Sequence, residues 1–101
     1  MLLALATIVA KPGKRDEIVR LAGPCLEASR QEPGVLSYQL YVSAEDSVTV
    51  RFIEKYVDKA ALKAHAKSAH LQALGKAIAD FQEGEMQIEL YPAPDPVQPG
   101  K

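Results

Sequence analysis

The chain has few of the residues that enzymes use for redox or nucleophilic chemistry. Its 101 residues include no tryptophan, one cysteine and two histidines. The lone Cys25 excludes a disulfide within the chain and favours a reducing compartment. Its apolar neighbours at helical spacing indicate a small buried side chain, not a nucleophile. No glycine-rich phosphate-binding loop and no strand–GxGxxG–helix unit is present, so we expect no nicotinamide, flavin or other cofactor.

An excess of charge of either sign is also missing. The chain has 12 lysines and arginines against 13 aspartates and glutamates, a net charge of −1, so we expect no binding to nucleic acid or anionic membranes. The apolar run at residues 1–10 is far shorter than the roughly 20 residues of a membrane span. It also lacks the basic segment of a signal peptide, so we interpret it as a strand and expect a cytoplasmic protein.

The hydrophobic spacing predicts one domain over residues 1–91. Residues 2–10 and 85–91 have the composition of strands, and residues 35–42 and 47–56 alternate with a period of two, as in a hairpin. Residues 14–31 and 58–83 follow helical spacing, the latter in two pieces. This β-α-β-β-α(α)-β order predicts a ferredoxin-like α+β fold with the helices on one face of an antiparallel sheet. The proline-rich residues 92–101 are expected to be an extended or disordered tail.

The first strand is apolar on both of its faces. Because the helices can cover only one face of a sheet, a second surface has to cover the other face. The simplest cover is a second copy of the same sheet, so we expect a homodimer in which two sheets face each other.

A short segment, residues 54–70, holds most of the groups capable of chemistry. Strand alternation places Phe52, Glu54 and Tyr56 on the helix-covered face. A buried carboxylate needs a partner or a raised pKa, so Glu54 is the sharpest candidate for a functional role. The alternative is that the strand frays before residue 54 and the carboxylate reaches solvent.

The two histidines follow on the helical part of the same segment. His65 lies beside the apolar stripe, from which it could pair with Glu54 across the gap between sheet and helix; the alternative is a histidine that only satisfies hydrogen bonds. His70 lies beside the apolar face of the second helical piece. It is a candidate for substrate binding, and the alternative is a helix cap or a surface residue. The spacings between Glu54, His65 and His70 match no metal motif, so we expect no metal.

Tyr38 and Tyr56 place phenol groups on inward faces. They fill the core or, together with Phe52, line a pocket for a flat aromatic substrate.

Three motifs in order resemble the antibiotic biosynthesis monooxygenase family over about residues 2–91. They are Lys11-Pro12-Gly13, the run from Glu32-Pro33-Gly34 to Tyr38, and Glu54-x-Tyr56 followed by Ala61-Leu62-x-x-His65. The resemblance implies a dimeric α+β barrel. It extends to the quinol monooxygenase branch and to the branch of phospho-autoinducer isomerases. The haem-degrading branch has an Asn and a Trp near the positions of Thr7 and Tyr56, so haem degradation is not expected.

The leading hypothesis is therefore a cofactor-independent monooxygenase that uses dioxygen to oxidise a small quinol or phenol or a polycyclic aromatic compound. One alternative is an isomerase or epimerase of a small oxygenated metabolite or signal, with the same Glu/His pair as acid and base. Another is a non-catalytic, stress-related module that binds a hydrophobic molecule. The candidate residues are His65 and Glu54 for catalysis and Tyr56, Phe52, Tyr38 and His70 for substrate binding.

Overall fold

The element order confirms the expected arrangement. The structure is a computed structural model and describes residues 1–94. Its elements are β1 (Leu2–Val9), α1 (Arg15–Arg30), β2 (Val35–Val42), β3 (Thr49–Tyr56), α2 (Lys59–Ala66), α3 (Ala69–Ile78), the short 3-10 helix η1 (Ala79–Phe81) and β4 (Gln87–Pro92).

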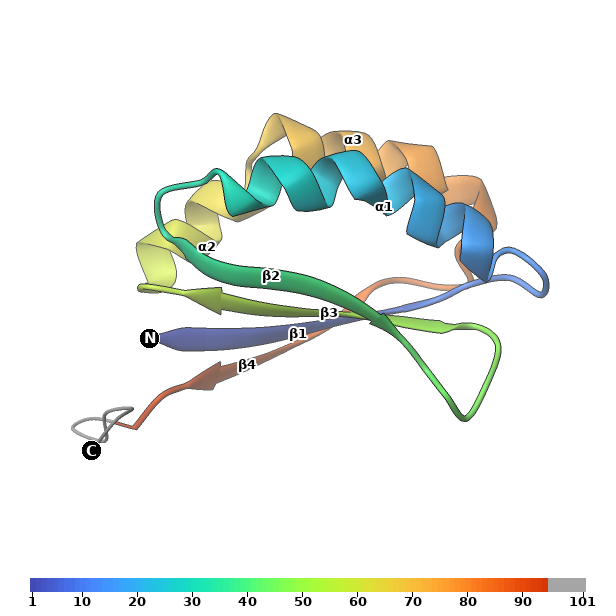
Figure 1. Cartoon of the computed structure of the whole chain (residues 1–101), viewed down its shortest axis with the longest axis horizontal. Coiled ribbons are helices and arrows are strands. Elements are labelled where there is room, and N and C mark those ends of the chain that lie inside the picture. The colour runs from blue at the N-terminus through green and yellow to red at the C-terminus, as the bar shows by residue number, and fades with distance from the viewer. Residues whose placement is uncertain (95–101) are drawn as a thin grey trace.

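The four strands form one antiparallel sheet in the order β2-β3-β1-β4. The helices all lie on the same face of this sheet, with α1 and α3 side by side above it and α2 at the end where β3 finishes (Figure 1). Together, the strand order and the single helical layer establish the ferredoxin-like α+β fold.

The core lies between the sheet and the helical layer. Alternate residues of the two central strands point into it, as the period-two pattern predicted. Cys25 of α1 is buried there with 2% of its surface exposed, which confirms its predicted role as a small core residue. The buried apolar residues of the two central strands are Leu2, Ala4, Ala6 and Ile8 of β1 and Val50, Phe52 and Tyr56 of β3.

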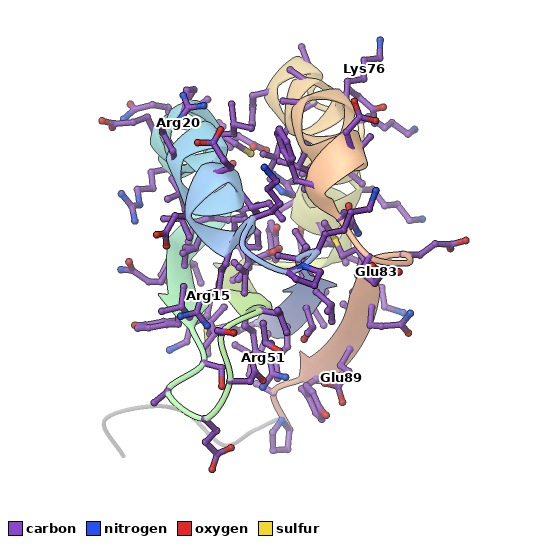
Figure 2. All side chains as sticks on the ribbon, turned by 90° about the vertical axis from the view of Figure 1, so that its right-hand side faces the viewer. Arg15, Arg20, Arg51, Lys76, Glu83 and Glu89 are labelled. Carbon is purple, nitrogen blue, oxygen red and sulfur yellow. The ribbon has the colours of Figure 1, made fainter. Side chains whose placement is uncertain are left out.

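The opposite face of the sheet is uncovered in the single chain. Leu3, Leu5 and Ile53 are only half-buried there. Figure 2 shows Arg51 and Glu89 on the side of the sheet away from the helices, and the Arg51 Nε donates to Thr7 Oγ1 at 2.9 Å. This face is therefore available to another surface.

Strand β4 is less covered than the other strands. Ile88 and Leu90 pair with Ala6 and Ala4 of β1, so they face the helical layer, but 60% and 47% of their surfaces are exposed. This exposure arises because β4 is an edge strand, where the helical layer gives little cover.

The last strand and the predicted tail meet near residue 92. Pro92 still pairs with Leu2 in the sheet, so β4 extends just beyond the predicted domain end at residue 91. Most of the predicted tail, residues 95–101, lies outside the described residues. Within residues 1–94, none of the helices has both the length and the apolar character needed to cross a membrane.

Candidate active site

A cavity of about 60 Å³ lies between the sheet and the helices α2 and α3. Four of the six predicted site residues line it: Tyr38, Phe52, Glu54 and His65. The rest of the lining is apolar, from Ala4 and Ala6 of β1 to Leu62 and Ala66 of α2, Leu71 and Leu74 of α3, and Met86 and Ile88 near and on β4. The polar groups are thus concentrated in an apolar hollow, as in many ligand sites.

Glu54 points into this cavity from the middle of the sheet. Strand β3 pairs on both sides, with β1 and β2, and continues to Tyr56, so the alternative of a frayed strand is wrong. Glu54 is 5% exposed. The Tyr56 hydroxyl donates a hydrogen bond to its Oε1 at 2.5 Å. Burial raises the pKa of Glu54, while the Tyr56 hydrogen bond and the nearby His65 oppose that rise.

His65 reaches the cavity from α2. The helix begins at Asp58, whose carboxylate accepts from the Ala61 N–H at 2.9 Å, and this start places His65 on the buried side with 3% exposure. The Nε2 of His65 lies 3.1 Å from the Tyr38 hydroxyl. Its Nδ1 lies 2.8 Å from Oε2 of Glu32.

The expected hydrogen bond between His65 and Glu54 is therefore not formed. Both ring nitrogens of His65 have other partners, and Glu54 is bonded to Tyr56 instead. The carboxylate that orients the imidazole is Glu32, a residue that the sequence analysis named only as part of a family motif.

Glu32 reaches His65 because the loop after α1 lies tightly against α2. A Cβ on Gly34 would overlap the Cβ of Ala61, so only glycine allows this close approach. The Glu32-Pro33-Gly34 run of the family motif could have indicated Glu32, because a glycine in a loop can mark a close approach to another element.

His70 lies behind Glu32 and does not line the cavity. It sits in the first turn of α3, whose N-cap Ser68 accepts from the Leu71 N–H at 3.3 Å. Its Nε2 is 2.6 Å from Oε2 of Glu32. Tyr56, fully buried, also lies outside the cavity lining and contacts Glu54 from behind. Glu32, His65 and His70 form the one group of possible metal ligands within residues 1–94.

One neutral tautomer of His65 satisfies both of its hydrogen bonds. An ionised carboxylate only accepts hydrogen bonds, so Glu32 takes an N–H from Nδ1 of His65 and another from His70. Neutral His65 then has an unprotonated Nε2, which accepts the Tyr38 O–H. Burial raises the pKa of Tyr38, so its phenol keeps its proton in the physiological range. A carboxylate, an imidazole and a phenol thus form a chain that ends at the cavity.

Comparisons with known proteins identify the family of the chain. The family model described as antibiotic biosynthesis monooxygenase matches residues 1–77, and the chain belongs to this family. Among curated proteins, "Putative monooxygenase YcnE" of Bacillus subtilis (strain 168) is 36% identical over 93 residues, which cover 89% of this chain and 98% of that protein.

Solved structures support the same assignment. A crystal structure of an antibiotic biosynthesis monooxygenase superposes with a TM-score of 0.85 at 33% identity, covering 92% of this chain and 98% of the other. PA3566 from Pseudomonas aeruginosa gives a TM-score of 0.81 at 29% identity, covering 89% and 90%. The family and these relatives support a monooxygenase-like function in general terms.

Proposed function

We propose that the protein is a cofactor-independent monooxygenase that oxidises a small phenol or hydroquinone with dioxygen. One observation carries the proposal: a carboxyl group with a raised pKa and an imidazole oriented by a second carboxylate both face one apolar cavity. Groups that give and take protons in a water-poor site are suited to acid–base catalysis.

The cavity volume favours a small substrate. A dry cavity of about 150 Å³ is known to accept benzene, whereas this cavity measures about 60 Å³. A single ring fits once flexible lining side chains such as Met86 and Leu71 move aside. A polycyclic compound would need much larger rearrangements, so we favour one-ring quinols over polycyclic substrates.

His65 acts as the base in this proposal. The substrate hydroxyl gives its proton to Tyr38, while the Tyr38 proton passes to Nε2 of His65 over the 3.1 Å hydrogen bond. Tyr38 ends with the proton count it started with. Glu32 stabilises the resulting imidazolium through its hydrogen bond to Nδ1.

The bound phenolate then supplies all of the electrons. It gives one electron to dioxygen, and the superoxide and phenoxyl radicals combine to form a C–O bond at a ring carbon. Loss of the ring proton to Glu54 and cleavage of the O–O bond release water, with protons returned by His65 and Glu54. For hydroquinone, one molecule of substrate and one of dioxygen give one molecule of hydroxyquinone and one of water. The organic molecule loses four electrons in total, and dioxygen gains the same four.

The isomerase alternative uses the same two groups but has less support. A phosphorylated substrate requires cationic partners, and within residues 1–94 no lysine or arginine lines the cavity. An uncharged substrate of an isomerase stays compatible with the site, as does binding without catalysis, so the experiment has to separate all three.

Isotope labelling under ¹⁸O2 with hydroquinone separates them. We expect one ¹⁸O atom in the hydroxyquinone product and oxygen uptake above the autoxidation background. His65→Ala should remove this uptake, whereas Lys63→Ala, an exposed change on the same helix, should leave it unchanged. Proton exchange without oxygen uptake would support the isomerase, and binding without either reaction would support the binding module.

We also propose that the working unit is a homodimer formed through the uncovered face of the sheet. The half-buried Leu3, Leu5 and Ile53 lie on this face. Light scattering after gel filtration should give twice 11.0 kDa, and Leu5→Lys should give a monomer; a wild-type monomer at tens of micromolar would exclude this assembly.

A further inference from the structure

Three side chains from separate parts of the chain converge beside the cavity. Oε2 of Glu32 lies 2.8 Å from Nδ1 of His65 and 2.6 Å from Nε2 of His70. All three ligand atoms lie within 4.8 Å of one another. The expectation of no metal considered only the local spacing of Glu54, His65 and His70, and could not include Glu32. We propose that Glu32, His65 and His70 form a binding site for a divalent transition-metal ion of the zinc class.

The donor set fits such an ion. Two imidazole nitrogens and one carboxylate oxygen are ligands of Zn²⁺ and of other first-row transition metals, which favour nitrogen donors more than Mg²⁺ or Ca²⁺ do. Ligands about 2.0–2.1 Å from a tetrahedral ion are about 3.3 Å from each other. Widening the two short contacts by about 0.5 and 0.7 Å, and bringing the two ring nitrogens to the same separation, therefore makes room for the ion.

The ligands are held by the fold and do not depend on one mobile loop. The Ser68 hydroxyl donates to the His65 carbonyl at 2.7 Å and also caps α3, so it ties His65 and His70 to one helix junction. Backbone hydrogen bonds from Glu32 N to Ser29 O and from Val35 N to Glu32 O, both 3.1 Å, fix the third ligand.

The surroundings of the ligands also match a metal site. A ligating histidine usually donates its other N–H to an oxygen, and Nε2 of His65 lies beside the Tyr38 hydroxyl. The side chains of Glu32 and His70 are 17% and 24% exposed, whereas that of His65 is 4% exposed. An ion can thus arrive from the solvent side and keep a water molecule as its fourth ligand.

Metal binding should also affect the proposed reaction. This inhibitory role rests on the proposed function, whereas the metal site itself does not. An ion on Nδ1 replaces the N–H that Glu32 accepts, and neutral His65 then carries its proton on Nε2. That nitrogen can no longer accept a proton from Tyr38. A bound ion should therefore stop the oxygenation reaction, and the site would act as an inhibitory metal site.

Titration of the metal-stripped full chain with ZnCl2 and CoCl2, without substrate, tests the site independently of any activity. Calorimetry should show one Zn²⁺ ion per chain with micromolar or tighter affinity, and Co²⁺ should give the visible absorption of a low-coordinate ion. Glu32→Gln and His70→Gln should each weaken binding at least tenfold, whereas the exposed carboxylate change Glu85→Gln should not. Circular dichroism confirms that each variant is folded.

The outcomes are decisive in both directions. Absence of binding at 100 µM ZnCl2, or equal affinity in wild type and in either ligand variant, would overturn the site. Oxygen uptake that falls with Zn²⁺ occupancy and returns with EDTA supports the inhibitory role. If Zn²⁺ binds as expected and a measurable uptake does not change, the inhibitory role is wrong and the site alone stands; if no uptake is found at all, the proposed function fails while the binding result is unaffected.

Discussion

Replacing Tyr56 with phenylalanine isolates the hydrogen bond that supports Glu54. Within residues 1–94, the Tyr56 hydroxyl is the single hydrogen-bond donor to this carboxyl group, and phenylalanine keeps the ring that packs in the core. Tyr56 is completely buried and Glu54 is 5% exposed, so the lost donor lies away from bulk solvent. Loss of a hydrogen bond to a neutral group costs about 1 kcal/mol, and loss of one to a buried charged group about 1.5–3 kcal/mol.

The cost should therefore depend on pH. Burial raises the pKa of Glu54 in the folded state above its value in the unfolded chain. The stability that this proton binding contributes is complete below the unfolded pKa and is lost as the pH rises through the folded pKa. Without the Tyr56 hydroxyl the folded pKa of Glu54 rises further, so the loss is larger. We expect Tyr56→Phe to lower the free energy of unfolding relative to wild type by about 1 kcal/mol near pH 4 and by about 2–3 kcal/mol at pH 8.

Urea unfolding followed by circular dichroism between pH 4 and pH 8, at one protein concentration, measures this difference. Tyr91→Phe is a matched control, because Tyr91 donates to Glu89 at 2.9 Å with the same two-residue separation but in an exposed pair. Its effect should stay within about 0.5 kcal/mol. A Tyr56→Phe penalty that is equal at pH 4 and pH 8 would show that Glu54 keeps one protonation state over this range, and would refute its role as a proton carrier.

Three further changes test the scaffold around the site. Gly34→Ala should cost about 1–3 kcal/mol in urea unfolding and reduce oxygen uptake, because the new methyl group overlaps Ala61 and displaces Glu32; Gly75→Ala, with open space around it, should not destabilise the protein. Asp58→Ala should cost about 1 kcal/mol by removing the cap of α2, measured by thermal unfolding. The stability of Glu54→Gln relative to wild type should rise with pH, because glutamine does not ionise. The total rise should be about 1.4 kcal/mol for each unit by which folding raises the pKa of Glu54. A stability difference that stays constant with pH would contradict the raised pKa of Glu54.

Strand periodicity explains what could be predicted about the site. Side chains alternate strictly between the two faces of a strand, so the apolar Val50 and Phe52 fix the side on which Glu54 and Tyr56 must lie. That inference needs no information from outside the segment. Helical spacing in the same way placed His65 beside the apolar stripe of its helix, and the residue is buried there.

The partner of His65 could not be predicted in this way. Glu32 lies 33 residues earlier in the chain, in a loop that has no periodicity. Its contact with α2 depends on the close approach of Gly34 to Ala61, which is a property of two packed elements and not of either segment alone. The exposure of Ile88 has a similar origin, because alternation gives the face of a strand but not how far the helical layer extends over it.

His65 is the residue that joins the two halves of the site. Its Nε2 side meets Tyr38 at the enclosed apolar cavity, and its Nδ1 side meets the partly exposed Glu32 and, through it, His70. Moving a proton or placing an ion on the exposed side changes which nitrogen of the ring is free on the enclosed side. Under the proposed function, the reactivity of the cavity therefore depends on Glu32 and His70, two residues that do not line it. These two act as positioning residues in the proposal, and control of the reaction is expected at the solvent-facing cluster that they form with His65.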